Sequence, residues 1–579
     1  MSSVAPFLVF FIGAALVVGT SGILRSLVML AIPVVGAVNL YMLPADASHV
    51  VPLLGYELEL IKVDKLSLLF GYLFHLAAFL GIVFSLHVDD RVQHVSGLLY
   101  AGSALGAVFA GDLLTLFLFW ELLAVTSVFL ILARGTERSY GAAMRYLLIQ
   151  VGSGVILLAG IAMHWTATGS TAIAQIGLQD WSSGLAGIAS WLLLFAIGIK
   201  ACFPLLHNWL PDAYPEATGT GSVWLSAFTT KLAVYALARG YAGTEILIWI
   251  GVVMTAFPVF FAIIENDLRR VLAYSLNNQL GFMVTGVGIG TELALNGTVA
   301  HAFCHILYKA LLFMSVGGVL LRTGTVKVSD LGGLHRSMPW TAGFCIIGTA
   351  SIAAVPLFSG FVSKAMIVSA LAHEGYFIPW LIILFASAAM FLPDIKVPYF
   401  AFFGRDAGYR VPEAPANMLV AMGIASAFCI GIGVVPEALY AMLPFDIDYA
   451  PYTFEHVVTQ LQLLTFAALA FVWLLRGGAY PREKPSVILD TDVIYRKGLP
   501  ALARWFRATF VPADRAVRRG LTGSFWRFVD QIYRHYGPAG ALARSVGAGN
   551  MAFWIITVLA IYLTVAITGS GIPSVVGGH

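Results

Sequence analysis

The sequence is short of charged residues and cysteine motifs, and each shortage excludes a class of protein. Only 11% of its 579 residues are charged, whereas a soluble domain averages about 25%. The formal net charge of +3 argues against nucleic acid as a partner. The four cysteines form no CxxC or CxxH pair, so a zinc site, an iron–sulfur centre and a disulfide framework lack support. We expect no cofactor and no metal.

Long apolar segments fill the chain instead, and hydrophobic residues make up 59% of it. A bilayer core takes about 20 residues of apolar helix, and about sixteen segments meet that length. The first residues lack the basic n-region of a cleavable signal peptide, so they are expected to form a first spanning helix. Because lipid cannot satisfy backbone groups, each segment should be helical. The sequence therefore predicts an all-α, multi-pass protein of the bacterial inner membrane.

These segments divide the chain into six parts. They are N-terminal spans (1–113), two central parts (114–264 and 265–410), C-terminal spans (411–476), a polar stretch (477–549) and a last span (550–579).

Basic residues set the expected orientation. Loops with Arg134, Arg269 and Arg405 alternate with stretches such as 164–186 and 436–455, which lack Lys and Arg. The positive-inside rule places the basic loops in the cytoplasm. Both termini would then be periplasmic.

Segment 477–549 mixes Arg and Lys with Trp, Phe and Tyr, and the same parity places it on the cytoplasmic side. This composition favours an amphipathic helix in the membrane interface over a soluble loop. Pro500 and Pro512 are expected to break the helix.

One apolar segment, 361–402, is far too long for a single helix, although parity requires one net crossing. It contains Gly375, Pro379, Pro393 and Pro398. We predict a discontinuous helix there, a common feature of transporter sites.

Ionisable residues inside the apolar segments are the main functional signal, because such residues are costly in lipid and functional by default. The candidates for a proton path are Glu121, Lys200, Lys231, His301, His305, Lys309 and Lys396.

Spacing gives some of these residues a mechanism. His301, His305 and Lys309 recur every four residues, so they line one helix face at steps of about 6 Å. Such a row can relay protons through water. Structural hydrogen bonding is an alternative, and so is a metal site, although the lysine disfavours a divalent ion.

Glu121 and Lys200 predict a switch. Burial disfavours the charged form of a lysine, and a nearby carboxylate restores it, so a pair that can separate controls a proton. The alternative is a static buried ion pair.

Two lysines lie close to prolines. Pro204 follows Lys200 by four residues, and Pro398 follows Lys396 by two. Two broken helices, each with a central lysine, fit internal repeats. Asp394 lies beside Lys396, and Lys364 is either part of a proton exit or an anchor.

Five motifs, matched in order, resemble a known family. They are FWELL, KACFPLLHNWLPDAYPEA, TTKLAVYALARG, YSLNNQLGF and HAFCHILYKALLF. The family is that of the antiporter-like subunits, which includes the large proton-pumping subunits of respiratory complex I and the A and D subunits of Mrp antiporters. The resemblance spans roughly residues 60–410 and is greatest to the Mrp D type.

The resemblance implies two inverted five-helix repeats, 114–264 and 265–410, each with a broken helix, and a hydrophilic axis along the membrane midplane. Glu121 would be the family's glutamate, and Lys396 the lysine of the second broken helix. Lys200 and Lys231 would be the lysine of the first broken helix and the connecting lysine. Asp394 departs from many members. Residues 488–545 would brace neighbouring subunits as a lateral helix.

The function expected from these features is proton translocation within a multisubunit Mrp-like Na⁺/H⁺ antiporter. Its partners would be other membrane subunits, the lipid bilayer, protons and Na⁺, and the chain would not be an enzyme by itself. Two alternatives are a proton-pumping subunit of a redox complex, of the complex I or hydrogenase type, and an energiser of inorganic-carbon uptake. A purely structural subunit is disfavoured, because it would not need these charges.

Overall fold

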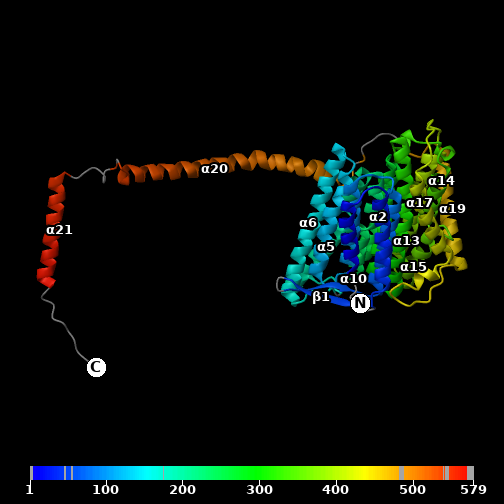
Figure 1. Ribbon diagram of the computed structural model, residues 1–579, viewed down its shortest axis with the longest axis horizontal. Coiled ribbons are helices and arrows are strands. Elements are labelled where there is room, and N and C mark those ends of the chain that lie inside the picture. Colours follow the sequence, from blue (N-terminus) through cyan, green and yellow to red (C-terminus); the bar gives the residue numbers. More distant parts are fainter. Residues whose placement is uncertain are drawn as a thin grey trace, which may run out of the picture. The chain divides into compact units, whose positions relative to one another are not determined.

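The chain divides into two units, Met1–Asp490 and Thr491–His579. The computed structural model describes residues 4–44, 47–53, 56–173, 175–481, 488, 490–538, 540 and 547–569. Figure 1 shows that the first unit is a bundle of helices that stand roughly side by side.

The bundle contains the following helices. They are α1 (Pro6–Gly19), α2 (Gly22–Tyr41), α3 (Lys65–Ser85), α4 (Arg91–Phe109), α5 (Leu113–Leu132), α6 (Glu137–Thr168), α7 (Leu185–Lys200), α8 (Trp209–Ala213), α9 (Gly219–Ala227), α10 (Thr229–Gly240), α11 (Ile246–Ile264), α12 (Leu268–Ile289), α13 (Glu292–Thr323), α14 (Pro339–Ile352), α15 (Ser359–His373), α16 (Phe377–Pro398), α17 (Ala416–Val434), α18 (Glu437–Tyr440) and α19 (Phe454–Arg476).

Ten helices of the described residues are long and apolar enough to cross a membrane. The remaining spans are the short helix α1, the more polar helices α4 and α12, and three helices that are interrupted: α7–α8, α9–α10 and α14–α15. The predicted all-α membrane fold and its number of spans are therefore confirmed.

A β-hairpin between α2 and α3 was not predicted. Strands β1 (Ser48–Leu53) and β2 (Tyr56–Lys62) pair antiparallel. The hairpin is fixed at the turn between α4 and α5, where the Glu59 amide donates to Asp112 at 2.8 Å and the Gly111 amide donates to the Glu59 carbonyl at 2.8 Å.

Two stretches of the bundle repeat the same element pattern. Helices α4 and α11 have 19 residues each, and α6 and α13 have 32 each. Both 32-residue helices begin after a capping threonine and end at a left-handed glycine. Helices α5 and α12 both begin after a capping aspartate that also forms an isolated β-bridge. Five crossings separate the start of α4 from the start of α11, and this odd number inverts the second stretch.

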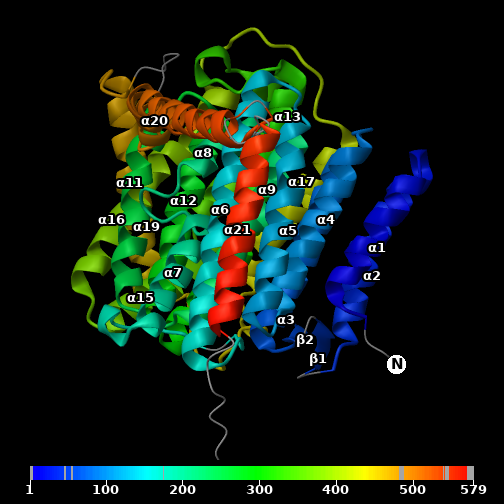
Figure 2. The same cartoon turned by 90° about the vertical axis from the view of Figure 1, so that its left-hand side faces the viewer.

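The interruptions repeat as well. Between α7 and α8, Cys202 and Leu205 have φ of 64° and 70°; between α14 and α15, Ala354 and Leu357 have φ of 58° and 73°. Left-handed backbone at a residue with a side chain costs about 1–2 kcal/mol, and such strain gathers at functional sites. The two broken helices run in opposite vertical directions, with α8 above α7 and α15 below α14 (Figures 1 and 2).

The second interruption is not where we predicted it. We expected a discontinuous helix within 361–402, broken near Lys396 and Pro398. Instead the chain turns between spans at Gly375, and α16 continues through Pro393 before a π-helical turn at Tyr399–Phe403. Helix α14 has 14 residues and α15 has 15, so neither spans about 30 Å alone. Together they form one broken span.

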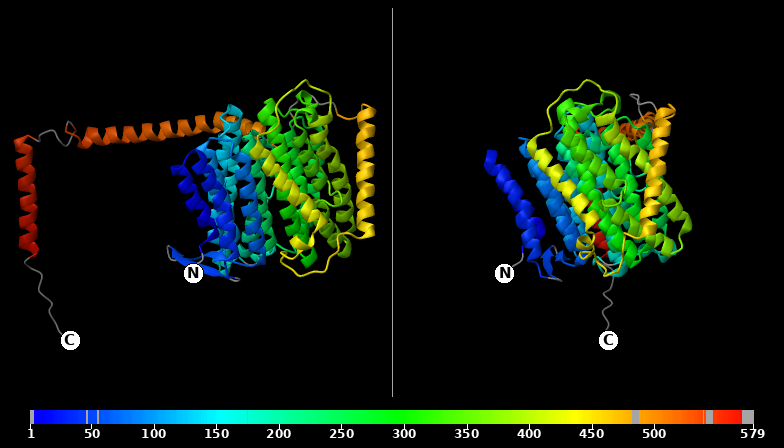
Figure 3. Two further views of the ribbon diagram at one scale, coloured as in Figure 1. Left: turned by 45° about the vertical axis from the view of Figure 1, so that its right-hand side comes forward. Right: turned by 90° about the vertical axis from the view of Figure 1, so that its right-hand side faces the viewer.

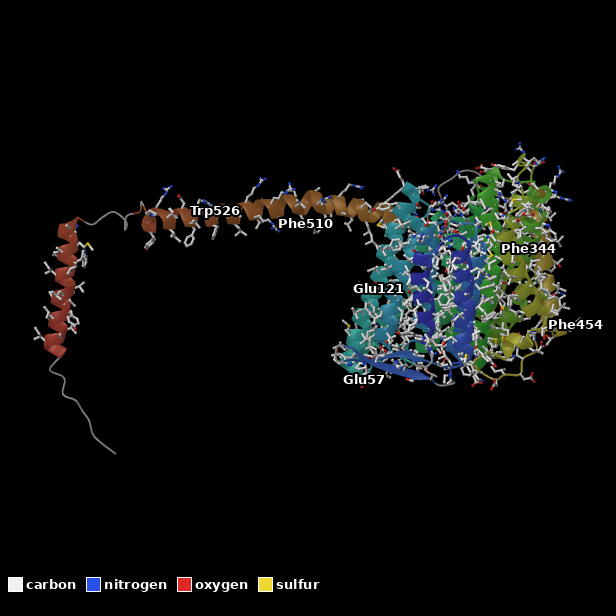
Figure 4. All side chains as sticks on the ribbon, viewed as in Figure 1. Glu57, Glu121, Phe344, Phe454, Phe510 and Trp526 are labelled. Carbon is white, nitrogen blue, oxygen red and sulfur yellow. The ribbon has the colours of Figure 1, made fainter. Side chains whose placement is uncertain are left out.

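The second unit contains a π-helical turn (Ile494–Gly498), α20 (Leu499–Tyr536) and α21 (Ala548–Gly569). Helix α20 has 38 residues, and none of its described side chains is buried. Pro500 lies in its first turn, where proline is tolerated, but Pro512 lies inside the helix. The prediction that these prolines break the helix is therefore wrong. Aromatic side chains such as Phe510 and Trp526 lie along α20 among arginines (Figure 4).

A pair of glycines in α17 tests the second interruption. A Cβ at Gly433 would overlap the Leu357 carbonyl oxygen, whereas one at Gly431 would meet nothing within 4 Å. Gly433→Ala should overpack this backbone and cost roughly 1–3 kcal/mol. We expect a lower midpoint of thermal unfolding in detergent for Gly433→Ala, and an unchanged or higher one for Gly431→Ala. Equal midpoints in the two variants would contradict the packing described here.

Candidate proton path

Glu121 and Lys200 face the same region of the bundle but do not form a contact pair. Glu121 lies about halfway between the two ends of the bundle (Figure 4), and its Oε1 is buried without a hydrogen-bond partner. The Lys200 ammonium donates to the Trp120 carbonyl at 2.7 Å and lies 4.5 Å from the centre of the Trp120 ring. No ion pair within 4.0 Å joins these two described residues. The two groups are therefore neighbours that do not form a direct ion pair in this structure.

Lys231 and Lys364 both bind carbonyl oxygens that interrupted helices leave free. The Lys231 ammonium donates to the Ser226 carbonyl at 2.6 Å, at the end of α9. The Lys364 ammonium donates at 2.6 Å to the carbonyl of Ile352, the last residue of α14. A cation at the C-terminal end of a helix is favourable, because the last carbonyls carry partial negative charge.

The histidine row of α13 is fully buried. His301 contacts the Ser363 hydroxyl through Nδ1 at 2.9 Å, and the centres of the His301 and His305 rings are 6.2 Å apart. Both nitrogens of His305 are buried without a partner. An unsatisfied buried nitrogen costs about 1–3 kcal/mol, so this ring is suited to bind water. Spacing had indicated the row, and the structure places it on the side of α13 that packs against α12 and α15.

Lys309 is joined through Ser275 to the carboxylate of Asp394. The sequence alone had left the role of this aspartate open. The Lys309 ammonium donates to the Ser275 hydroxyl at 2.9 Å, and that hydroxyl donates to Asp394 Oδ1 at 2.8 Å. These three side chains come from α13, α12 and α16, and each is at most 2% exposed. A hydroxyl that accepts from an ammonium and donates to a carboxylate is a continuous path for one proton.

Lys396 was predicted to be the lysine of the second broken helix, and this prediction is wrong. Its ammonium donates to the carbonyls of Ile263 and Glu265 at 2.9 and 2.6 Å, at the end of α11. Lys364, five residues beyond the end of the second interruption at Ser359, is the lysine of the second broken helix. The prolines near Lys396 had given the stronger sequence signal.

Unpartnered buried polar atoms occur at several further positions between these groups. Besides Glu121 and His305, they belong to Gln150, Thr230 and Asn277. They come from α6, α10 and α12, so they extend across both repeating stretches. Burying a polar group without a partner is costly, and hydration of the bundle interior would remove that cost. Among these residues, Gln150 and Thr230 had not been singled out from the sequence.

At the end of the bundle that carries most arginines, ion pairs fix the loop after the first interruption. Arg145 binds Asp212 at 2.7 Å, and Arg138 binds Glu216 at 2.8 Å, which makes these carboxylates anchors. Asp490 also binds here: it is 3.0 Å from His207 Nε2, and Tyr274 donates to it at 2.9 Å. No sequence signal indicated this contact with Asp490, because it joins positions far apart in the chain.

The described residues contain no group of three or more His, Cys, Asp or Glu side chains arranged to hold a metal. His301 is committed to Ser363, and the adjacent cationic groups of Lys309 and Lys364 oppose a second positive charge in this region.

The fold and these side chains define a multi-pass helical membrane protein with a line of ionisable groups through its interior. A family model described as "NADH:quinone oxidoreductase/Mrp antiporter, TM" matches residues 110–391. The N subunit of the NADH-quinone oxidoreductase of Desulforudis audaxviator is 32% identical over 426 residues, which cover 66% of this chain and 82% of that protein. The chain therefore belongs to the NADH:quinone oxidoreductase/Mrp antiporter family of membrane subunits.

The chain is also similar to two proteins of antiporter complexes. The D component of the Na(+)/H(+) antiporter of Alkalihalophilus pseudofirmus is 30% identical over 329 residues, which cover 54% of this chain and 66% of that protein. A chain of the Mrp complex from Dietzia sp. DQ12-45-1b matches the fold with a TM-score of 0.65 at 21% identity, over 81% of this chain and 95% of that chain.

Two glycines of α6 test the position of the Glu121 carboxylate. A Cβ at Gly154 would overlap Glu121 Oε1, whereas a Cβ at Gly152 would meet nothing within 4 Å. Gly154→Ala should fold, because the flexible end of a side chain can move aside, but it should displace the carboxylate. A misplacement of about 1 Å can cost up to 10²-fold in rate, so we expect proton transport to fall by about tenfold, as measured in membrane vesicles. Normal transport in Gly154→Ala, or an equal loss in Gly152→Ala, would show that this position is unimportant.

Proposed function

We propose that this protein is a proton-translocating membrane subunit of a multisubunit, Mrp-like Na⁺/H⁺ antiporter of the bacterial inner membrane. The chain itself moves protons along Glu121, Lys200, Lys231, His301, His305, Lys309, Asp394 and Lys364. Lys396 supports the end of α11 instead. The loops rich in arginine face the cytoplasm, and both termini are periplasmic.

One observation carries this proposal: the buried lysines are not locked into ion pairs. Each of the four on the path donates to a backbone carbonyl, at 2.6–3.3 Å, and no carboxylate of a described residue lies within 4.0 Å of its ammonium. Burial disfavours the charged form of a lysine, and a neutral carbonyl offsets that cost less than a carboxylate does. Such a lysine can release its proton without breaking a salt bridge.

The unpartnered atoms of Glu121, Gln150, Thr230, Asn277 and His305 provide positions for water between the lysines. Protons can then move between neighbouring groups over a few ångströms at a time. A charge that arrives at one lysine raises the cost of a charge at the next, which couples the steps along the axis.

A second candidate is a proton-pumping subunit of a redox complex. The similarity to the N subunit of an NADH-quinone oxidoreductase over 82% of its length favours it. Electrons would then flow in a partner subunit of that complex. The subunits that co-purify with the chain, identified by mass, decide between small antiporter subunits and quinone- or hydrogenase-type subunits.

Neutralising either Glu121 or Lys200 tests the proposal directly. Glu121→Gln and Lys200→Met should each abolish proton-coupled transport, because the path loses a group that exchanges a proton. Transport is measured as the cation-driven collapse of a pH gradient in vesicles that contain the whole complex. The matched controls are Glu57→Gln and Lys65→Met, which change the same residue types at exposed positions. Transport that persists in both Glu121→Gln and Lys200→Met would refute this function.

The Lys309–Ser275–Asp394 path gives a separate prediction. Asp394→Asn removes the proton acceptor, and Ser275→Ala removes the hydroxyl that joins it to Lys309. Positioned proton-transfer groups contribute about 10²–10⁴-fold, so transport should fall by at least tenfold in both variants, while Asp446→Asn, at an exposed aspartate, should retain it. Full activity in Ser275→Ala would mean that the serine bridge is not used.

A further inference from the structure

The structure contains a cavity between Lys364 and helix α19. It has a volume of about 160 Å³, which is room for several water molecules. Lys364 lines it on one side, and Glu455, His456 and Gln460 of α19 line the other. Helix α19 stands at the edge of the bundle against α16 (Figure 3).

We propose that this cavity is filled with water and carries protons between Lys364 and the surface of the bundle at the start of α19, with His456 as the last proton-carrying side chain. The proposal rests on the function proposed above and deepens it, because it assigns the end of the path. Helix α19 lies outside both repeating stretches, so this wall of the cavity belongs to neither of them.

Contacts tie Lys364 to the buried row on one side of the cavity. Ser363, the residue before it, holds His301 at 2.9 Å. The Lys364 side chain is buried, and it also lies 5.0 Å from the centre of the Phe282 ring. A proton that reaches this lysine from His301 therefore needs one further route out.

Helix α19 contacts the second interruption directly. The Gln460 amide donates to the Ala353 carbonyl at 3.0 Å, and Tyr452, just before α19, accepts from the Leu357 amide at 3.2 Å. Any change in the backbone of this interruption is thereby transmitted to the wall of the cavity.

The contacts of His456 assign its ring nitrogens. Nδ1 lies 3.2 Å from the Pro451 carbonyl, which can only accept, so Nδ1 carries the hydrogen. Nε2 is then the basic nitrogen, and it lies 3.3 Å from the Ser369 hydroxyl, which also lines the cavity. A proton released by the Lys364 ammonium passes through water to Nε2, and the imidazolium returns one proton to water outside. The neutral amine of Lys364 takes the next proton from His301, so lysine, histidine and water each regain their starting form.

The charges around this end of the cavity favour proton release. The other ionisable groups nearby are Glu455, which lines the cavity, and Tyr449, whose hydroxyl is 3.1 Å from that of Ser369. The carboxylate of Glu455 attracts protons to this end of the cavity.

Water access is tested with introduced cysteines. The four native cysteines are buried and are first replaced by alanine. Ser387→Cys and Thr459→Cys place a thiol in the cavity, whereas Phe385→Cys places one on the exposed face of α16, where the native side chain is 63% exposed. A small, charged, water-soluble methanethiosulfonate is added to the outer face of vesicles that contain the whole complex. We expect the cavity thiols to react and transport to fall several-fold, with no reaction at residue 385.

The role of His456 is tested by chemical rescue. His456→Ala should slow proton transport by roughly tenfold or more, and added imidazole should restore part of it, which a purely structural role would not allow. If the cavity thiols do not react, or if His456→Ala transports normally, the cavity does not carry protons. Glu121→Gln and Lys200→Met in the same vesicles separate the two proposals: loss of transport in these variants leaves the main function intact, and normal transport in both variants refutes both proposals.

Discussion

The structure depends on how charged groups are accommodated in an apolar bundle. Five lysines, at positions 200, 231, 309, 364 and 396, are at most 5% exposed, and each donates to a backbone carbonyl oxygen. Three of these carbonyls, bound by Lys231, Lys364 and Lys396, are available because helices end or break beside the lysines. Lys200 and Lys309 donate to carbonyls within α5 and α12. For Lys200, Lys231, Lys309 and Lys364, an ion pair would hold the charge more firmly, but it would also make proton release more costly. The arrangement thus favours mobile protons over a fixed charge pattern.

The two repeating stretches of helices each contribute ionisable groups to the path, but they differ in how their carboxylates are held. The two stretches share helix lengths, caps and strained interruptions, yet their carboxylates differ. The first has Glu121 with an unpartnered oxygen, whereas the second has Asp394 joined to Lys309 through Ser275. A carboxylate without a hydrogen bond is freer to approach a lysine than one that is held. The first stretch is therefore suited to switching, and the second to steady conduction.

The sequence predicted the spans, the family and most buried charges, because each depends on a local pattern: a charge within an apolar run, or histidines four residues apart. It did not predict the second interruption, since Pro356 is a single proline whereas Pro393 and Pro398 form a stronger cluster that α16 nevertheless accommodates. It left the role of Asp394 open and did not indicate the contacts of Asp490, because such contacts join distant positions through tertiary packing. The β-hairpin was missed because its strands are short and lie between long apolar segments.

The second unit carries large apolar side chains on two long helices. Helix α20 has no buried side chain among those described, yet it carries large exposed apolar residues such as Trp505, Phe506 and Trp526. Helix α21 is apolar enough along its length to cross a membrane. Apolar surface of this extent marks an interaction site, and an isolated helix gains little stability from its backbone alone. Lipid can cover α21, but the aromatic and basic faces of α20 require two different surroundings. A helix at the membrane interface, with lipid on one side and polar groups of neighbouring subunits on the other, satisfies both.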